Sequence, residues 1–206
     1  MASAGPGPGR RAAGGDQHRL AGIAVPRRAG RRQPLGHSHH YSSEGRDHGG
    51  ALETAGGIAK ALPWLGDCFW LVSGDIVAPG FAFDAQQAAQ FAAGDDDAHL
   101  WLVPNPGFHR AGDFALAGQR VLRPPAGQPR PLTYANLALL RRRLVAGLTV
   151  GQPAALGPLL FASAAAGRLG GQVLRGDWHN VGTPDQWTAL QAPAAAAHAT
   201  TTPGRQ

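Results

Sequence analysis

The feature that most limits the possible folds is an alternation of short apolar runs with helix-like segments, which starts near residue 41. Runs such as CFWLVSGDIV (68–77) and AHLWLVPNPG (98–107) are apolar and end at Gly, Pro or an acid, as buried strands do. Segments such as FDAQQAAQFAAGDDD (83–97) and GPLLFASAAAGRLG (157–170) read as helices. Further strands are predicted at 132–140 and 172–182, a hairpin at 113–123, and helices at 49–66 and 183–191. The alternation predicts an α/β layer architecture.

Glycines and prolines predict where these elements end. We expect segment 49–66 to be a Gly-rich loop followed by a short helix that ends near Pro63. The hairpin should turn at Ala117-Gly118, and the helix at 157–170 should stop at Gly170-Gly171. The last helix should begin with Thr183 as its N-cap. The apolar face of the helix at 83–97 should consist of Phe83, Ala88 and Ala92.

The positive charge of the chain lies in its first forty residues. They carry seven arginines and one acid, Asp16, which accounts for the net charge of +6 of all 206 residues. They show neither helical nor strand periodicity and hold few large apolar side chains, so we expect residues 1–40 to be disordered. The low-complexity tail, 192–206, should be disordered too, which leaves residues 41–191 as one domain.

Two further features limit the class of protein. No run of 18 apolar residues occurs, so we expect no membrane span and a cytoplasmic location. Cys68 is the single cysteine and stands before Phe-Trp-Leu-Val, which favours a buried structural thiol over a nucleophile.

Three short motifs could carry chemistry. In ETAGGI (53–58), Gly56 and Gly57 would let the backbone approach a ligand, with a helix beginning just after them. SGD (73–75) places Asp75 at a strand end, where a carboxylate can hold Mg²⁺. DWHNVGTP (177–184) places Asn180 before a helix start, with Trp178 packing on the alternate face. Each also has a purely structural explanation: a turn with positive φ, a capped turn, and an Asx-turn into an N-cap.

In order and spacing, ALETAGGIAKALPWLGDCFWLVSGDIV, NPGFHRAGDFAL, LTYANLALL and GDWHNVGTP together resemble the sugar-1-phosphate nucleotidyltransferase family. The resemblance covers about residues 41–190 and is strongest to the N-acetylmuramate-1-phosphate uridylyltransferase and mannose-1-phosphate guanylyltransferase-like groups. It implies a Rossmann-like mixed sheet of the GT-A type. It also implies transfer of a nucleotidyl group from a nucleoside triphosphate, UTP or GTP, to a sugar-1-phosphate for cell-wall or surface polysaccharide metabolism.

The resemblance also implies roles for individual residues. Asp75 would ligate Mg²⁺, and so would Asn180, where the family commonly has Asp and where a neutral amide attracts the ion less. The residues that would face the sugar are Asn105, Asp113 and the Tyr134-Ala135-Asn136 strand. The residues expected to line the nucleotide pocket are Glu53, Thr54, Gly56 and Gly57.

The chain departs from the family at its N-terminus. It lacks the first strand, the Gly-rich LAAGxGxR loop and the Pro-Lys-Pro segment, and its only lysine is Lys60. Because such transfer depends on positioning and on cations near the developing charge, we expect impaired activity and a sheet truncated at its N-terminal strand.

A shifted reading frame explains this departure. Read one base later, the codons of Gly15–His40 permit VINTAWLESQFPGALGDGSRWAIAI, which resembles the family segment before ETAGG. We therefore interpret residues 1–40 as out of frame, a hypothesis that nucleotide sequencing across residues 35–45 tests.

Three alternatives remain open for the N-terminal segment. Its arginines could form a nucleic-acid-binding arm on a non-catalytic α/β module, although aromatic residues are not interleaved with them. It could be a targeting peptide, although serines are few. A metal site could form from His37, His39, His40 and His48, although that spacing also follows from composition. The family reading predicts no nucleic-acid partner.

Overall fold

The computed structural model describes residues 40–191, which divide into two compact units. One unit comprises residues up to Asp67 together with Arg142–Ala162, and the other comprises Cys68–Arg141 and the residues from Ser163 on. The predictions about residues 1–39 and 192–206 lie outside the described residues, so the domain boundaries at 40 and 192 stay predictions.

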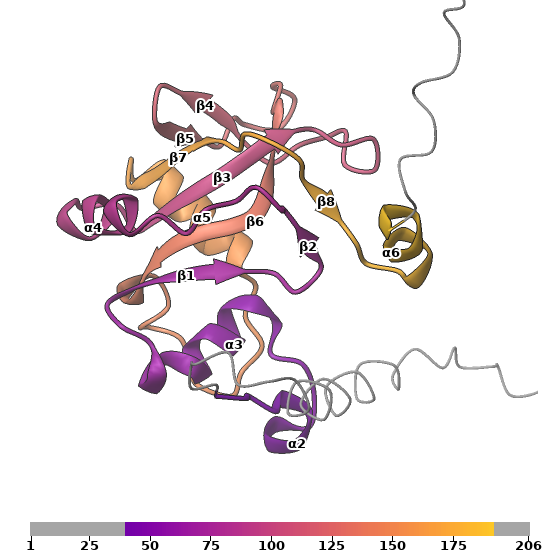
Figure 1. The fold of residues 1–206 in the computed structure, drawn as a ribbon. Helices are drawn as coiled ribbons and strands as arrows, with labels where there is room; N and C mark the ends of the chain where they lie inside the picture. The colour runs from indigo at the N-terminus through magenta and orange to yellow at the C-terminus, as the bar shows by residue number, and fades with distance from the viewer. Residues whose placement is uncertain (1–39, 192–206) are drawn as a thin grey trace, which may run out of the picture. The chain divides into compact units, whose positions relative to one another are not determined.

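The second unit is built on a six-stranded mixed sheet with the order β1-β6-β3-β7-β5-β4 (Figure 1). Only β3 and β7 are parallel; every other neighbouring pair is antiparallel. A separate two-stranded sheet pairs β2 with β8. The strands are β1 Cys68–Val72, β2 Ile76–Val77, β3 Ala98–Pro104, β4 Ala115–Ala117, β5 Arg120–Leu122, β6 Leu132–Arg141, β7 Leu169–Val173 and β8 His179–Asn180.

A Rossmann-like mixed sheet was therefore predicted correctly; β3 is buried as expected, and β6 is a strand as predicted. β1 is a correction: the sequence predicts a fully buried strand, but β1 is half-buried because it ends the sheet and pairs only with β6 among the described strands. The hairpin turns at Gly118-Gln119, one residue beyond the predicted position, with Gly118 at φ 60°.

Helix α4 (Ala85–Ala93) covers one face of this sheet. Its Phe91 packs in a buried cluster with Trp101 and Val103 of β3 and Leu137 of β6, and Trp70 of β1 packs against that cluster. The predicted apolar face of α4 was wrong in part, because Phe83 is 57% exposed and Ala92 is exposed, whereas Phe91 and Ala88 face the sheet. Asp84 caps the helix by accepting a hydrogen bond from Gln86 N.

A bulge interrupts the pairing of β3 with β6. Leu100 pairs with Ala138, but the next pair is Leu102 with Tyr134, so β6 has two extra residues opposite Trp101. Within this bulge Asn136 adopts φ 57°, a left-handed conformation that asparagine tolerates better than most residues.

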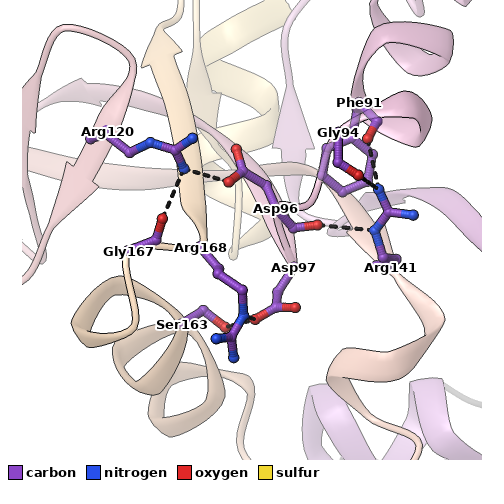
Figure 2. Close-up of polar contacts among 9 residues, drawn as sticks. All are labelled: Phe91, Gly94, Asp96, Asp97, Arg120, Arg141, Ser163, Gly167 and Arg168. Carbon is purple, nitrogen blue, oxygen red and sulfur yellow. Dashed lines mark hydrogen bonds and ion pairs between the residues drawn. The ribbon is translucent and has the colours of Figure 1, made fainter.

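The end of the sheet where β3 and β7 begin is held by ionic and backbone contacts (Figure 2). The buried carboxylate of Asp97 accepts hydrogen bonds from Ser163 Oγ at 3.1 Å and Arg168 Nε at 2.9 Å. Arg120 pairs with Asp96, and Arg141 donates to the carbonyls of Phe91 and Gly94. These contacts join β3, β5, β6 and the turn before β7, so this end of the sheet is fixed without any ligand.

The first unit contains α2 Glu44–His48, α3 Glu53–Ala61 and the 3-10 turns η1 Leu62–Trp64 and η2 Arg142–Leu144. The Glu44 carboxylate accepts a hydrogen bond from Leu52 N at 2.8 Å, and Lys60 Nζ donates to Asp47 at 2.6 Å. The hydrogen bonds from Lys60 and then Arg46 lower the pKa of Asp47 to about 2. The only lysine of the chain thus joins α3 to α2.

The division between the units falls within α5 (Leu156–Ala165). This helix was predicted to stop at Gly170-Gly171, but it ends before Gly167, which has φ 67°. Gly170 and Gly171 instead belong to β7, where a Cβ on Gly171 would lie 2.5 Å from Val121 Cγ2 and 2.7 Å from Leu100 O. Close strand packing therefore requires the glycine that the sequence suggested as a helix stop.

Candidate active site

Asp75 lies in the tight turn between β1 and β2. Ile76 N donates to Ser73 O at 3.3 Å, which closes the turn, and Asp75 is half-buried. β1 runs parallel to β3, so this turn lies at the carboxyl end of the sheet, opposite the ionic contacts of Asp97. That edge is where open α/β sheets bind ligands.

Asn180 reaches Asp75 through the pairing of β2 with β8. Ile76 lies opposite Asn180 in the register, and Val181 N donates to Asp75 O at 2.7 Å. The side-chain amide of Asn180 donates to Asp75 Oδ2 at 3.2 Å. The two predicted metal ligands, 105 positions apart in the chain, are therefore in direct contact.

The bulge of β6 anchors both sides of this pair. Asn136 O accepts a hydrogen bond from Ser73 N at 3.1 Å, which fixes the turn that carries Asp75. Ala135 O accepts one from Trp178 Nε1 at 2.9 Å, which fixes the segment that leads to Asn180. Trp178, predicted to pack on the alternate face of its strand, packs against the core cluster. The irregular backbone around Asn136 thus positions Asp75 and Asn180 together.

A hollow of about 400 Å³ opens beside Asp75, within the size range of small-ligand sites. It is lined by Gly74, Asp75, Val77, Val181, Gly182, Thr183, Pro184 and Trp187. This lining carries one acid and no base, so an anionic substrate needs a cation beside Asp75. Two backbone N–H groups just before α6 (Pro184–Gln191) are not free to bind an anion, because Gly182 N and Thr183 N both donate to Gln186 Oε1.

Asp75 and Asn180 suit a hard cation. A carboxylate and an amide oxygen are ligands that Mg²⁺ accepts, and this ion commonly takes few protein ligands and completes its shell with phosphate and water. Within residues 40–191 no group of three or more His, Cys, Asp or Glu side chains could hold a metal ion. The fit to Mg²⁺ therefore rests on a two-residue set, in which the Asn180 amide would have to turn its oxygen toward the ion.

The predicted sugar-facing residues Asn105 and Asp113 lie in the loop between β3 and β4. Asn105 Nδ2 donates to Arg130 O at 2.8 Å, and Thr133 Oγ1 donates to Asn105 Oδ1 at 3.0 Å. Asp113 Oδ2 accepts from Tyr134 N at 3.0 Å, while its other oxygen lies 2.9 Å from His109 Nε2. Both side chains hold this loop to the start of β6, and their contact with a sugar stays a prediction.

Tyr134, in the same predicted sugar-facing strand, has a buried hydroxyl with no hydrogen-bond partner among the described residues. Burial raises the pKa of this hydroxyl, so it stays protonated at physiological pH.

The four residues predicted to line the nucleotide pocket occur together in the first two turns of α3. The helix begins at Glu53, at φ 56°, so the prediction of a loop before a helix was wrong for Gly56 and Gly57, which lie inside it. Ala55 N and Gly56 N both donate to Ala154 O, at 2.9 and 3.1 Å. A Cβ on Gly56 would lie 2.6 Å from Gln152 O, so this glycine permits close backbone packing. A nucleotide contact by these residues stays a prediction.

Two structural roles were not predicted from the sequence, although Asn136 itself was expected to face the sugar. The anchoring role of Asn136 depends on its positive φ, and the only sequence signal is an asparagine inside an apolar strand. The contact of His109 with Asp113 could have been suspected from their spacing of four residues. Neither signal is specific enough to predict the contact.

The described helices include none that is both long and apolar enough to cross a membrane. No protein-family model matches the chain. The geometry above nevertheless defines a class: an α/β domain with a Rossmann-like mixed sheet and an acid–amide pair at its carboxyl edge.

Comparison with known sequences narrows that class. The chain is 38% identical over 148 residues to N-acetylmuramate alpha-1-phosphate uridylyltransferase of Neisseria meningitidis, and 34% identical over 160 residues to the protein of the same name from Caulobacter vibrioides. Each alignment covers 71% of this chain. The chain spans slightly less than two thirds of these relatives, 64% and 63% of their lengths.

The fold agrees with this relationship. A crystal structure of a protein assigned as a glucose-1-phosphate thymidylyltransferase, from Bacillus anthracis, superposes with a TM-score of 0.55 at 14% identity, over 68% of this chain and 59% of that one. In sequence the chain is therefore similar to a sugar-1-phosphate nucleotidyltransferase, and its fold is shared with a member of that enzyme class.

Proposed function

We propose that this chain acts on UTP and a sugar-1-phosphate, transferring the uridylyl group to form a UDP-sugar and pyrophosphate. The direct contact between Asp75 and Asn180 at the carboxyl edge of the sheet carries the proposal. The names of the two sequence relatives favour UTP over GTP and an N-acetylmuramate-type sugar.

In this reaction a phosphate oxygen of the sugar-1-phosphate attacks the α-phosphorus of UTP. The bond from the α-phosphorus to the oxygen that bridges to the β-phosphorus breaks, and pyrophosphate leaves with that oxygen. When bound at Asp75 and Asn180, Mg²⁺ supplies positive charge that offsets the charge gathering on these phosphates. The chain itself positions the two ligands. The hydrogen bond from Ser73 N to Asn136 O holds the turn that carries Asp75, and the hydrogen bond from Val181 N to Asp75 O holds Asn180 beside it on β8.

The proposal includes a low rate. The family loop with its arginine and lysine has no counterpart in the sequence, and removing a single charge-stabilising donor from an active site typically costs roughly 10²–10³ in rate. Lys60, the only lysine, is hydrogen-bonded to Asp47. We therefore propose that substrate binding is better retained than turnover.

Two measurements on the full chain test this function. Pyrophosphate release should be assayed with UTP, GTP and dTTP against several sugar-1-phosphates. Thermal stabilisation by UTP should be measured with and without Mg²⁺. We expect Mg²⁺-dependent stabilisation by UTP that Asp75→Asn abolishes and that Asp185→Asn, an exposed acid on α6, leaves unchanged. Stabilisation that survives Asp75→Asn would remove Asp75 from the site, and turnover equal to that of an intact relative would refute the proposed low rate.

A further inference from the structure

A second hollow, of about 630 Å³, lies on the α4 side of the sheet. Its walls come from the segment before α4, from α4 itself, from the β4–β5 hairpin and from the end of β7. The lining residues are Gly80, Phe81, Ala82, Asp84, Gln87, Trp101, Leu116, Gly118, Gln119, Gly171, Gln172, Val173, Leu174 and Arg175. It shares none of them with the hollow beside Asp75, so the two are separate places in the same unit.

The second hollow exists because α4 covers only part of the sheet. The helix packs on β1 and β6, whereas β7 lies on the far side of β3 from β6. Gln172, on the α4 side of β7, is consequently only half-buried. The hairpin and the segment around Phe81 also contribute to the lining.

The polar part of the lining consists mainly of uncharged amides. Gln87 Nε2 of α4 donates to Gln172 Oε1 of β7 at 3.1 Å and lies 3.4 Å from His99 Nε2. Gln172 lies opposite Trp101 in the parallel register, so these side chains are neighbours on one face. An amide carries both donors and acceptors, as a hydroxyl group does, so this arrangement suits a ligand rich in hydroxyl groups.

The apolar part of the lining is aromatic. The rings of Phe81 and Trp101 meet edge to face with centroids 5.2 Å apart, and His99 packs beside Trp101 without lining the hollow. Trp101 is only 3% exposed, so it holds Phe81 in place from below, and the half-buried ring of Phe81 supplies the preformed apolar surface.

The charges of the lining argue against a phosphate ligand. Arg175 is its only base, and the acid Asp84 already accepts the capping hydrogen bond from Gln86 N. Burial lowers the pKa of His99 despite the opposing effects of Asp96 and Gln172, so its ring is neutral at physiological pH. A phosphate would meet a single cation, whereas a neutral ring with hydroxyl groups matches the amides and the aromatic surface.

We propose that this second hollow, lined by Gln87, Gln172, Phe81 and Trp101, binds an unphosphorylated monosaccharide. The site is independent of the proposed uridylyl transfer, since no residue beside Asp75 takes part. Most of the hydrogen bonds come from the glutamines of the lining, Gln87, Gln119 and Gln172, and the half-buried ring of Phe81 contacts the apolar face of the sugar ring.

The test is saturation-transfer NMR on the full chain with D-glucose, N-acetyl-D-glucosamine and N-acetylmuramic acid, with and without UTP and Mg²⁺. We expect saturable binding of at least one sugar that UTP does not displace. Gln87→Ala and Gln172→Ala should each weaken it about five- to tenfold, the effect of losing one hydrogen bond in a buried setting. Gln90→Ala is the matched control, because Gln90 lies on α4, is exposed and does not line the hollow.

Three results would overturn the proposal. They are no saturable binding of any sugar, equal binding by the Gln172→Ala and Gln90→Ala variants, and loss of binding in Asp75→Asn, which would place the sugar beside Asp75 instead. Circular dichroism and the melting temperature of each variant show whether it is folded. Since Asp75 lies outside this hollow, failure of the nucleotide test leaves the sugar test valid, and the reverse holds too.

Discussion

The side-chain amide of Asn180 donates a hydrogen bond to the carboxylate of Asp75 at 3.2 Å, across the paired strands β2 and β8. The neutral amide of Asn180 neither cancels the negative charge of Asp75 nor adds to it. The family commonly has a second carboxylate at this position, which would repel Asp75 until a cation is bound. The pair found here should therefore need no cation for its stability, and it would attract Mg²⁺ less strongly than two carboxylates.

Placing a second carboxylate at position 180 should weaken the fold without a cation and strengthen the binding of Mg²⁺. Asn180→Asp should lower the melting temperature in EDTA, because two carboxylates in contact repel each other and one is driven toward protonation. Added Mg²⁺ should stabilise the variant more than the parent chain, and the comparison is read as the difference in melting temperature between EDTA and Mg²⁺. Equal responses of variant and parent would show that Asn180 does not face the ion.

Trp178 should stabilise the site through its indole nitrogen rather than only through its ring. Trp178→Phe keeps an aromatic ring in the core but leaves Ala135 O without its hydrogen bond, which should cost about 1–2 kcal/mol in the free energy of unfolding. Urea denaturation measures this cost. The control is Trp187→Phe, since Trp187 is 48% exposed and should change stability little. Equal effects of the two substitutions would mean that the hydrogen bond contributes nothing.

The sequence predicted the strands of the sheet better than it predicted how they associate. β3 and β6 are recognisable because their apolar runs are long and stop at prolines or charged residues. The pairing of β2 with β8 could not be predicted, because each strand has only two residues and the partners lie more than a hundred positions apart. The sequence places Asp75 and Asn180 at strand ends, at the carboxyl edge of the sheet, and the family resemblance pairs them as metal ligands, but only the structure shows their contact.

Glycines account for the main errors of prediction. Gly56, Gly57, Gly170 and Gly171 were interpreted as a ligand-binding loop and a helix stop, but they lie in α3 and β7. At Gly56 and Gly171 the reason is close approach of another backbone or strand, a requirement set by tertiary packing. Sequence reasoning sees the glycine but not the neighbour that demands it.

The two glycines of α3 should therefore differ in their tolerance of alanine. In Gly56→Ala the new Cβ would meet Gln152 O at 2.6 Å, a backbone atom, so overpacking of about 1–3 kcal/mol should outweigh the gain in helix propensity of about 1 kcal/mol. In Gly57→Ala it would meet Glu44 Oε1 at 2.7 Å, the end of a flexible side chain, so stability should change little. Thermal denaturation of both variants checks this.

A different outcome would favour the functional interpretation of these glycines. If Gly56→Ala is as stable as the parent chain but loses stabilisation by UTP and Mg²⁺, its role is close approach of a ligand rather than packing against Gln152. The same pair of measurements on Gly57→Ala shows whether its position in α3 contributes to nucleotide binding at all.

The pH dependence of stability should report the environment of His99. Burial is the largest influence and lowers its pKa below the ordinary value of 6.5, against the attraction of Asp96. The unfolded chain then binds a proton more readily than the folded one, so His99 should destabilise the fold as the pH drops below about 6.5, until the folded state also binds the proton. The slope from this one group is at most about 1.4 kcal/mol per pH unit.

Urea midpoints of the parent chain and of His99→Gln between pH 8 and pH 5 isolate the contribution of His99, because groups common to both chains cancel in the difference. The parent should lose stability relative to the variant on acidification. A parent that gains stability instead would show that the carboxylate of Asp96 outweighs burial, and that the ring beside Trp101 carries a charge in the folded chain.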